Sequence, residues 1–277
     1  MGAVSPAMIK ELRDKTGLGL KKCKEALVET GGDVEKAVES LRKAGMASAE
    51  KRMDRTTSQG SVFPYISEDG KKGALVALSC ETDFVAKTDD FKALGLKLAK
   101  HCAENSLSGA EALAEASIDG VSVGDMIKEH IAKLGENLNA GKVSSFSASG
   151  KLFDYVHGEG ALLGVMLEID GADDGATEIG KDLCMHIAAS APVYTNKDEV
   201  PAEILEKEKD IYREQITGKP ENVIEKILTG KMNKFYQENC LEDQTFIKDD
   251  KKSVAKILSE ANSSYKIKTF ARFQIGA

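Results

Sequence analysis

Residues 120–124 (GVSVG) have the spacing of a catalytic serine. In the G-x-S-x-G pattern, a serine at a sharp strand-to-helix turn attacks an acyl group, and a histidine elsewhere in the chain takes its proton. The pattern requires a buried strand before the serine, but residues 111–119 have the composition of a helix followed by a loop. Ser122 is better explained as the N-cap of a helix over 125–134. A serine hydrolase is kept as one alternative.

The other common catalytic and metal-binding motifs do not occur in the sequence. No Gly-Lys pair is followed by serine or threonine, so the phosphate-binding loop G-x-x-x-x-G-K-[ST] is absent. There is no H-E-x-x-H motif. The histidines lack the spacing of a metal site; they are His101, His130, His157 and His186. We therefore expect no catalytic residue, no metal ion, no cofactor and no nucleotide hydrolysis.

The composition is that of a globular protein, with 277 residues, 42% apolar and 30% charged. Lys and Arg number 38 and Asp and Glu 45, and the resulting net charge of −7 argues against direct nucleic-acid binding. No apolar run approaches the roughly 18 residues that span a bilayer, and residues 1–6 lack the features of a secretion signal. The five cysteines are scattered without a C-x-x-C pair, which is typical of reduced thiols. We expect a cytoplasmic protein without membrane contact.

The first 45 residues predict three short helices. Ser5 and Pro6 have the residue types of an N-cap and a first helical position, and Gly45 follows the third helix. So small a bundle encloses only a very small core, and we expect Leu18 and Leu20 on the first turn to stay exposed. These features indicate a docking module. A plain bundle without a surface role is the alternative.

An internal repeat follows a polar segment at 50–60 that we interpret as a linker. Each copy has the pattern of a strand, a turn, a second strand and an amphipathic helix. The matching segments are 60–66 with 150–156, 73–78 with 164–169, and 98–103 with 183–188. The sequence therefore predicts an α+β fold with a duplicated core and antiparallel sheets.

The two copies differ between the second strand and the helix. The first copy has six more residues there, within 80–87 (CETDFVAK), where the second copy has an ordinary polar loop. Function is often located on loops that differ between similar scaffolds. Phe84 supplies apolar area beside the carboxylate of Asp83, and this pair could act as a wedge in a partner. The alternative is that Phe84 only covers the core of the first copy.

The C-terminal third predicts a helical hairpin inserted in the second copy. Two helices over 201–239 are joined at 218–220, and a short connection makes them antiparallel neighbours. A strand near 245–247, a helix over 253–260 and a last strand follow, with residues 267, 269, 271, 273 and 275 on one face of that strand. The expected domains are a helical head at 1–49, the linker at 50–60, a first core subdomain at 61–141 and a second at 142–277, with the hairpin at about 201–240.

The sequence resembles the bacterial elongation factor Ts family, the guanine-nucleotide exchange factors of the GTPase elongation factor Tu. The strongest match is CETDFVAK at 80–87. Further matching motifs lie in the same order from the head to the hairpin: 9–13, 16–19, 23–27, 135–137, 155–158, 186–189, 218–220 and 230–235. The resemblance covers nearly the whole chain. It implies a ubiquitin-associated-like head, a core of two related subdomains and an inserted helical hairpin.

The resemblance also implies a partner and the residues that meet it. The partner would be elongation factor Tu, whose GDP release the protein would promote without covalent chemistry of its own, so it would not be an enzyme. The implied wedge near the magnesium and phosphate site of the GTPase consists of Thr82, Asp83, Phe84 and Val85. Further implied contacts are Arg13 and Leu20 in the head and His157 in a turn of the second copy. The competing class is a binding-only or chaperone-like module that releases no nucleotide.

Overall fold

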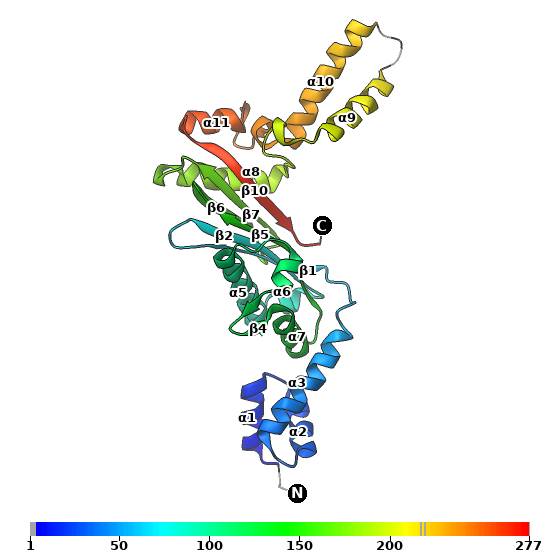
Figure 1. Ribbon diagram of the computed structural model, residues 1–277, viewed down its shortest axis with the longest axis vertical. Helices are drawn as coiled ribbons and strands as arrows, with labels where there is room; N and C mark the ends of the chain where they lie inside the picture. The colour runs from blue at the N-terminus through cyan, green and yellow to red at the C-terminus, as the bar shows by residue number, and fades with distance from the viewer. Residues whose placement is uncertain (1–3, 217, 219, 277) are drawn as a thin grey trace.

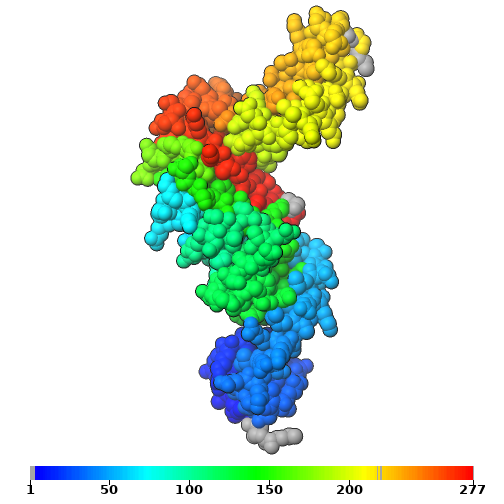
Figure 2. All heavy atoms as spheres, viewed as in Figure 1, coloured from blue at the N-terminus to red at the C-terminus, as the bar shows by residue number. Residues whose placement is uncertain are grey.

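The computed structural model describes residues 4–216, 218 and 220–276. The described chain is elongated (Figures 1 and 2). A helical head, residues 4–50, lies at one end, two three-stranded antiparallel sheets with their helices form the centre, and a helical hairpin projects at the other end. The α+β class, with three N-terminal helices ahead of small antiparallel sheets, is confirmed.

The three helices of the head pack around one small core. They are α1 (Pro6–Thr16), α2 (Leu20–Glu29) and α3 (Val34–Glu50). The side chain of Ser5 caps α1, as expected, and Leu12 and Leu27 are fully buried between the helices. Leu18 is half-buried against this core, whereas Leu20 is 56% exposed. The prediction that both turn leucines are exposed is therefore right only for Leu20.

Helix α3 continues through Gly45, so the predicted end of this helix is wrong. Its second half leaves the head and packs on α7 (Val123–Leu134) of the central body. A Cβ atom on Gly45 would lie 3.0 Å from the Cβ of Ala132, so glycine allows the two helices to approach closely. Ala49 is fully buried in the core of the first half. These contacts offset the low helix propensity of glycine.

The two copies of the repeat form two separate sheets, which confirms the predicted duplication. The first sheet has the order β1-β2-β5 and the second the order β10-β7-β6, all antiparallel. The bounds of the strands are β1 (Gln59–Ile66), β2 (Lys72–Cys80), β5 (Leu138–Ser147), β6 (Lys151–His157), β7 (Leu163–Asp170) and β10 (Lys266–Gln274). In each copy the two consecutive strands of the repeat form a hairpin, and a later strand completes the sheet on the far side of the second one.

Strand β5 was not predicted. Three residues separate it from α7, and it pairs with β2 through residues on both sides of position 141. The expected boundary between the subdomains at 141 therefore falls inside this strand. We propose that the first subdomain extends to Ser147, because residues 142–147 belong to its sheet.

Each copy packs its helix on its sheet through the same pair of residue types. The helices are α5 (Asp89–Asn105) and α8 (Thr177–Ser190). Gly95 of α5 lies against the ring of Phe63, and Gly180 of α8 lies against the ring of Phe153, so that a Cβ atom on either glycine would overlap the ring. Because Gly95 and Gly180 have no side chain, an aromatic ring from the sheet fills the space between helix and sheet in each copy.

The two sheets also pack face to face, so the central body has four layers in the order α5, first sheet, second sheet, α8 (Figure 1). Val62, Leu75 and Met166 are among the buried side chains between the sheets. A register irregularity in β10 places Ile267 in the core beneath α8, whereas Phe273 lies between the sheets. The prediction that alternate residues 267 to 275 share one face is therefore wrong for Ile267, whereas Ala271, Phe273 and Ile275 do lie together between the sheets.

The helical hairpin has the predicted place in the chain. It consists of α9 (Ala202–Gln215) and α10 (Glu221–Asn239), and residue 219 of the predicted connection lies outside the described residues. The remaining elements are α4 (Asp83–Ala86), α6 (Ala110–Glu115), β3 (Ser117–Ile118), β4 (Val121–Ser122), β8 (Thr245–Phe246), β9 (Asp249–Ser253), α11 (Val254–Ala261) and three short 3-10 helices, Asp174–Ala176, Lys197–Glu199 and Leu241–Asp243. Within the described ranges, no helix combines the length and apolar character needed to cross a membrane.

We expect Gly95→Ala to destabilise the protein by about 1–3 kcal/mol, because the added methyl group must displace the Phe63 ring. Gly230→Ala in α10 is the matched control, since no atom lies within 4 Å of the added Cβ. That variant should be neutral or more stable by up to about 1 kcal/mol, as alanine favours helix. Urea unfolding followed by circular dichroism measures both. Equal effects of the two substitutions would contradict the packing described.

Candidate functional site

Phe84 lies on the outside of the molecule. It is 79% exposed on α4, a helix of four residues, whereas the next residue, Val85, is buried against the core of the first copy. The alternative that Phe84 covers the core is therefore wrong. Helix α4 is anchored by Val85 and Ala86, and its opposite face presents an aromatic ring to solvent.

Local hydrogen bonds explain how so short a helix forms between β2 and α5. The hydroxyl of Thr82 accepts from the backbone N–H of Val85 at 3.4 Å, as the N-cap of α4. The hydroxyl of Thr88 donates to the carbonyl of Val85 at 2.7 Å and caps α5 by accepting from Phe91. The thiol of Cys80 donates to the carbonyl of Thr82 at 3.1 Å. The two threonines thus satisfy backbone groups that a single helical turn leaves unpaired.

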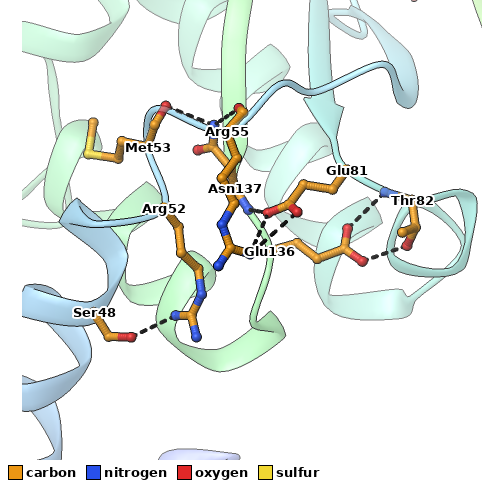
Figure 3. Close-up of polar contacts among 8 residues, drawn as sticks. All are labelled: Ser48, Arg52, Met53, Arg55, Glu81, Thr82, Glu136 and Asn137. Carbon is orange, nitrogen blue, oxygen red and sulfur yellow. Dashed lines mark hydrogen bonds and ion pairs between the residues drawn. The ribbon is translucent and has the colours of Figure 1, made fainter.

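A carboxylate from a distant part of the chain holds Thr82 in place (Figure 3). The backbone N–H of Thr82 donates to Oε2 of Glu136 at 2.9 Å, and the Thr82 hydroxyl donates to Oε1 of Glu136 at 2.6 Å. Glu136 lies between α7 and β5. Hydrogen bonds to a carboxylate are among the stronger ones in proteins, so this pair fixes the start of α4.

Asp83 lies next to Phe84 and pairs with Lys87, the residue that follows α4. Its Oδ2 is 2.6 Å from Nζ of Lys87, and both side chains are exposed. The hydrogen bond from Lys87 lowers the pKa of Asp83 below its ordinary value. The Asp83 side chain is therefore ionised at neutral pH and is held beside the exposed ring.

A groove of about 540 Å³ separates α4 from the second copy. Asp83 and Lys87 border one side, and the turn at 158–162 between β6 and β7 borders the other. The hydroxyl of Ser61 in β1 donates to the carbonyl of Gly160 at 2.7 Å and keeps this turn beside the groove. The groove thus has walls from both halves of the duplicated core.

His157 is the last residue of β6 and begins this turn. Its ring is exposed, and its Nδ1 lies 2.9 Å from the hydroxyl of Tyr155. The structure therefore brings Asp83 of the proposed wedge and the turn that follows His157, which are far apart in sequence, to two sides of one groove. The sequence did not indicate that they meet.

The two residues expected to bind a partner in the head are on α1 and α2, at the end of the molecule away from the two sheets (Figure 1). Leu20 begins α2 and borders a shallow apolar hollow together with Ile9, Lys21 and Lys24. Arg13 is exposed on α1. The candidate contacts therefore divide into two surfaces, one on the head and one at the groove.

Ser122 has a structural role that accounts for its position. Its hydroxyl accepts from the backbone N–H of Asp125 at 3.0 Å as the N-cap of α7, which confirms the predicted cap. The strand that precedes α7, β4, has only two residues and is not buried. The structural context of a nucleophile elbow is missing, so the hydrolase alternative is wrong. In the described part of the chain, no cluster of three or more His, Cys, Asp or Glu side chains could hold a metal ion.

The sequence did not assign a role to Glu136 or to the lysine and leucine side chains beside the groove. Residues 135–137 (GEN) were recognised as a family motif, but a motif does not indicate which backbone groups its side chains hold. Lys92 and Leu96 of α5 border the groove, and Leu96 is 52% exposed on the solvent-facing side of this helix, together with Lys92, Lys97 and Lys100. The available signal for Leu96 was an apolar residue on the polar face of a predicted amphipathic helix.

Cys80 should be unreactive in the folded protein. Burial, together with the nearby negative charge of Glu136, raises the pKa of Cys80 to about 12. Roughly one thiol in ten thousand is then ionised at pH 8, and only the thiolate reacts. We expect peptide mapping after alkylation at pH 8 to find Cys80 unmodified in the native protein and modified in denaturant, with the native rate increasing as the pH rises. Rapid native labelling at pH 8 would show that α4 does not cover this thiol.

Comparison with known proteins gives a consistent result. A model of the family described as Elongation factor TS matches residues 81–277. Elongation factor Ts of Aquifex aeolicus is 42% identical over 286 aligned residues that cover 99% of this chain and 98% of the relative. The proteins of the same name from Halothermothrix orenii and Methylococcus capsulatus are also 42% identical and cover 99% of this chain and 92% of each relative. The chain therefore belongs to the elongation factor Ts family of translation elongation factors.

Proposed function

We propose that the protein is a guanine-nucleotide exchange factor that binds elongation factor Tu carrying GDP and promotes GDP release, so that GTP can bind. The observation that carries this proposal is the 79% exposure of Phe84 on a helix that is anchored by Val85 and Glu136. A large aromatic side chain held in water gains free energy when a partner buries it. The protein makes and breaks no covalent bond in this reaction.

The wedge acts by disturbing the site that holds the partner's nucleotide. Phe84 enters a pocket of the GTPase and displaces the elements that hold Mg²⁺, and the diphosphate then loses a major counter-charge. Burial of Phe84 contributes about 1.5–3 kcal/mol to the complex. Asp83, ionised and held by Lys87, orients the wedge more than it adds affinity. Because the coupling is reciprocal, GDP weakens the complex by the factor by which the complex weakens GDP.

The remaining contacts increase affinity rather than drive release. In this proposal the head, a ubiquitin-associated-like module, docks on the GTPase through Arg13 and Leu20, which are both exposed. The turn that begins at His157 contacts the GTPase across the groove from Asp83, the neighbour of Phe84. The reaction takes place in the cytoplasm and involves no direct contact with nucleic acid.

We expect Phe84→Ala to slow catalysed GDP release by about tenfold or more, because about 1.4 kcal/mol of lost binding to the exchange-competent state is a factor of ten. Its stability should change by less than about 0.5 kcal/mol, as for other surface substitutions. The measurements are release of a fluorescent GDP from elongation factor Tu with catalytic amounts of the protein, and urea unfolding of the free variant.

Phe91→Ala is the matched comparison, since Phe91 is fully buried seven residues further along the chain. That variant should lose about 3–5 kcal/mol of stability. If Phe84→Ala loses as much stability as activity, Phe84 belongs to the fold and the wedge is wrong. If the unmodified protein binds elongation factor Tu but leaves GDP release at its spontaneous rate, the protein is a binding-only module.

Leu20→Ala should raise the concentration of elongation factor Tu·GDP at which the exchange rate is half-maximal, with the maximal rate unchanged. This result is expected if the head binds the GTPase equally well before and during nucleotide release, because such binding affects KM and not kcat. Val28→Ala is the control, because Val28 is 61% exposed on the same helix and lies outside the apolar hollow beside Leu20. Steady-state exchange kinetics over a range of elongation factor Tu·GDP concentrations separate the two constants. An effect on kcat alone would contradict a docking role.

A further inference from the structure

Two adjacent residues, Glu136 and Asn137, lie between the end of α7 and the start of β5 and hold two different parts of the molecule. Glu136 accepts both hydrogen bonds from Thr82 and so fixes the start of α4, which carries Phe84. In the function proposed above Glu136 serves only as an anchor of α4, and Asn137 has no role. Glycine at 135 adopts a left-handed conformation (φ 84°) and ends α7 immediately before this pair.

Asn137 holds the linker that leads to the head (Figure 3). Its side chain is buried, and Nδ2 donates to the backbone carbonyls of Met53 at 2.9 Å and of Arg55 at 2.7 Å. Its backbone N–H donates to Oε1 of Glu81 at 2.7 Å, and the Arg55 guanidinium pairs with the same carboxylate at 3.4 Å. The linker, whose side chains are mostly polar and exposed, is thereby tied to the core through its main chain.

Helix α7 also holds α3, the helix that precedes the linker. Arg42 of α3 pairs with Glu129 of α7 at 2.8 Å, and Glu50 at the end of α3 pairs with Lys128 of α7 at 3.5 Å. Surface ion pairs contribute little alone, but here they accompany the close packing at Gly45. The head, the linker and the start of α4 are therefore all held by one continuous stretch, α7 and the two residues that follow Gly135.

We propose that Glu136 and Asn137 are positioning residues for nucleotide exchange, which present the wedge and the head to the GTPase in one fixed relation. This inference rests on the exchange function proposed above. Glu136 sets the orientation of Phe84 through the cap of α4. Asn137 sets the direction in which the linker leaves the core, and so the place of Leu20 relative to Phe84. Two binding surfaces that are already held in the correct relative position lose less conformational freedom when the complex forms, which favours association.

The two residues should therefore affect different kinetic constants. Glu136→Gln keeps the size of the side chain but leaves only one acceptor oxygen for the two donors of Thr82, so the wedge is misplaced once the complex has formed. Asn137→Ala frees the carbonyls of Met53 and Arg55 to meet water, because the linker side chains around them are exposed. The head then binds without a fixed relation to the wedge.

The experiment is steady-state exchange on elongation factor Tu·GDP with the full chain and four variants. We expect Glu136→Gln to lower kcat by about tenfold or more with little change in KM, as a small misplacement of a reacting group does. We expect Asn137→Ala to raise KM by about tenfold with kcat retained. Glu111→Gln on α6 and Asn105→Ala at the far end of α5 are matched surface controls and should leave both constants unchanged.

A disulfide gives a second measurement, which tests whether fixing α3 on α7 is enough to restore the function of the Asn137→Ala variant. Cysteines replacing Gly45 and Ala132 would join α3 to α7 once the two Cβ atoms, 3.0 Å apart as the helices lie, separate by about half an ångström to the spacing of a disulfide, and the five native thiols are buried. In the Asn137→Ala background, the oxidised protein should recover the KM of the unmodified protein and the reduced protein should not. Recovery in the oxidised form alone supports the proposal.

The outcomes separate this inference from the function on which it depends. If the unmodified protein does not accelerate GDP release, the exchange function fails and this inference fails with it. If the unmodified protein is active but the substitutions at 136 and 137 act like the surface controls, or change both constants alike and are not rescued by the disulfide, the positioning role alone is wrong.

Discussion

The proposed site depends on keeping an aromatic side chain in water on a helix of only four residues. Such a helix does not form alone, because the first helical turn fixes several residues for a single hydrogen bond. Here Thr82 and Thr88 supply the caps, Val85 anchors the turn in the core, and the carboxylate of Glu136 accepts two hydrogen bonds from Thr82. Since all of this support comes from the inner side, Phe84 is free of any role in the fold.

The duplicated core explains why that support is rigid. Both copies fix helix to sheet with a glycine against a phenylalanine, and the two sheets pack face to face between the helices (Figure 1). The copies differ where the first has α4 and the second has only the 3-10 helix Asp174–Ala176. The second copy instead supplies the turn at 158–162 on the other side of the groove. One scaffold thus carries two different surfaces, which meet because the sheets are stacked.

Features set by local chemistry were predictable from the sequence. The cap at Ser5, the paired strands of each repeat, the hairpin helices and the cap at Ser122 all follow from turn residues and periodicity within a few positions. Features set by distant contacts were not. Helix α3 continues past Gly45 because α7 packs on it, and β5 was missed because it completes the sheet beside a strand nearly 60 residues earlier. For the same reason the sequence singled out residues 80–87 as the proposed wedge segment but did not indicate the hydrogen bonds from Thr82 to Glu136.

The central claim is that the ring at position 84 is exposed in the free protein and buried in the GTPase, and a tryptophan tests it directly. The chain contains no tryptophan, so Phe84→Trp places a single indole at this position. The measurement is its fluorescence, taken as the difference from the same mixture containing the unsubstituted protein. We expect the emission of a water-exposed indole in the free variant and a shift to shorter wavelength when elongation factor Tu·GDP is added. If the complex forms but the emission remains that of a water-exposed indole, the account is contradicted.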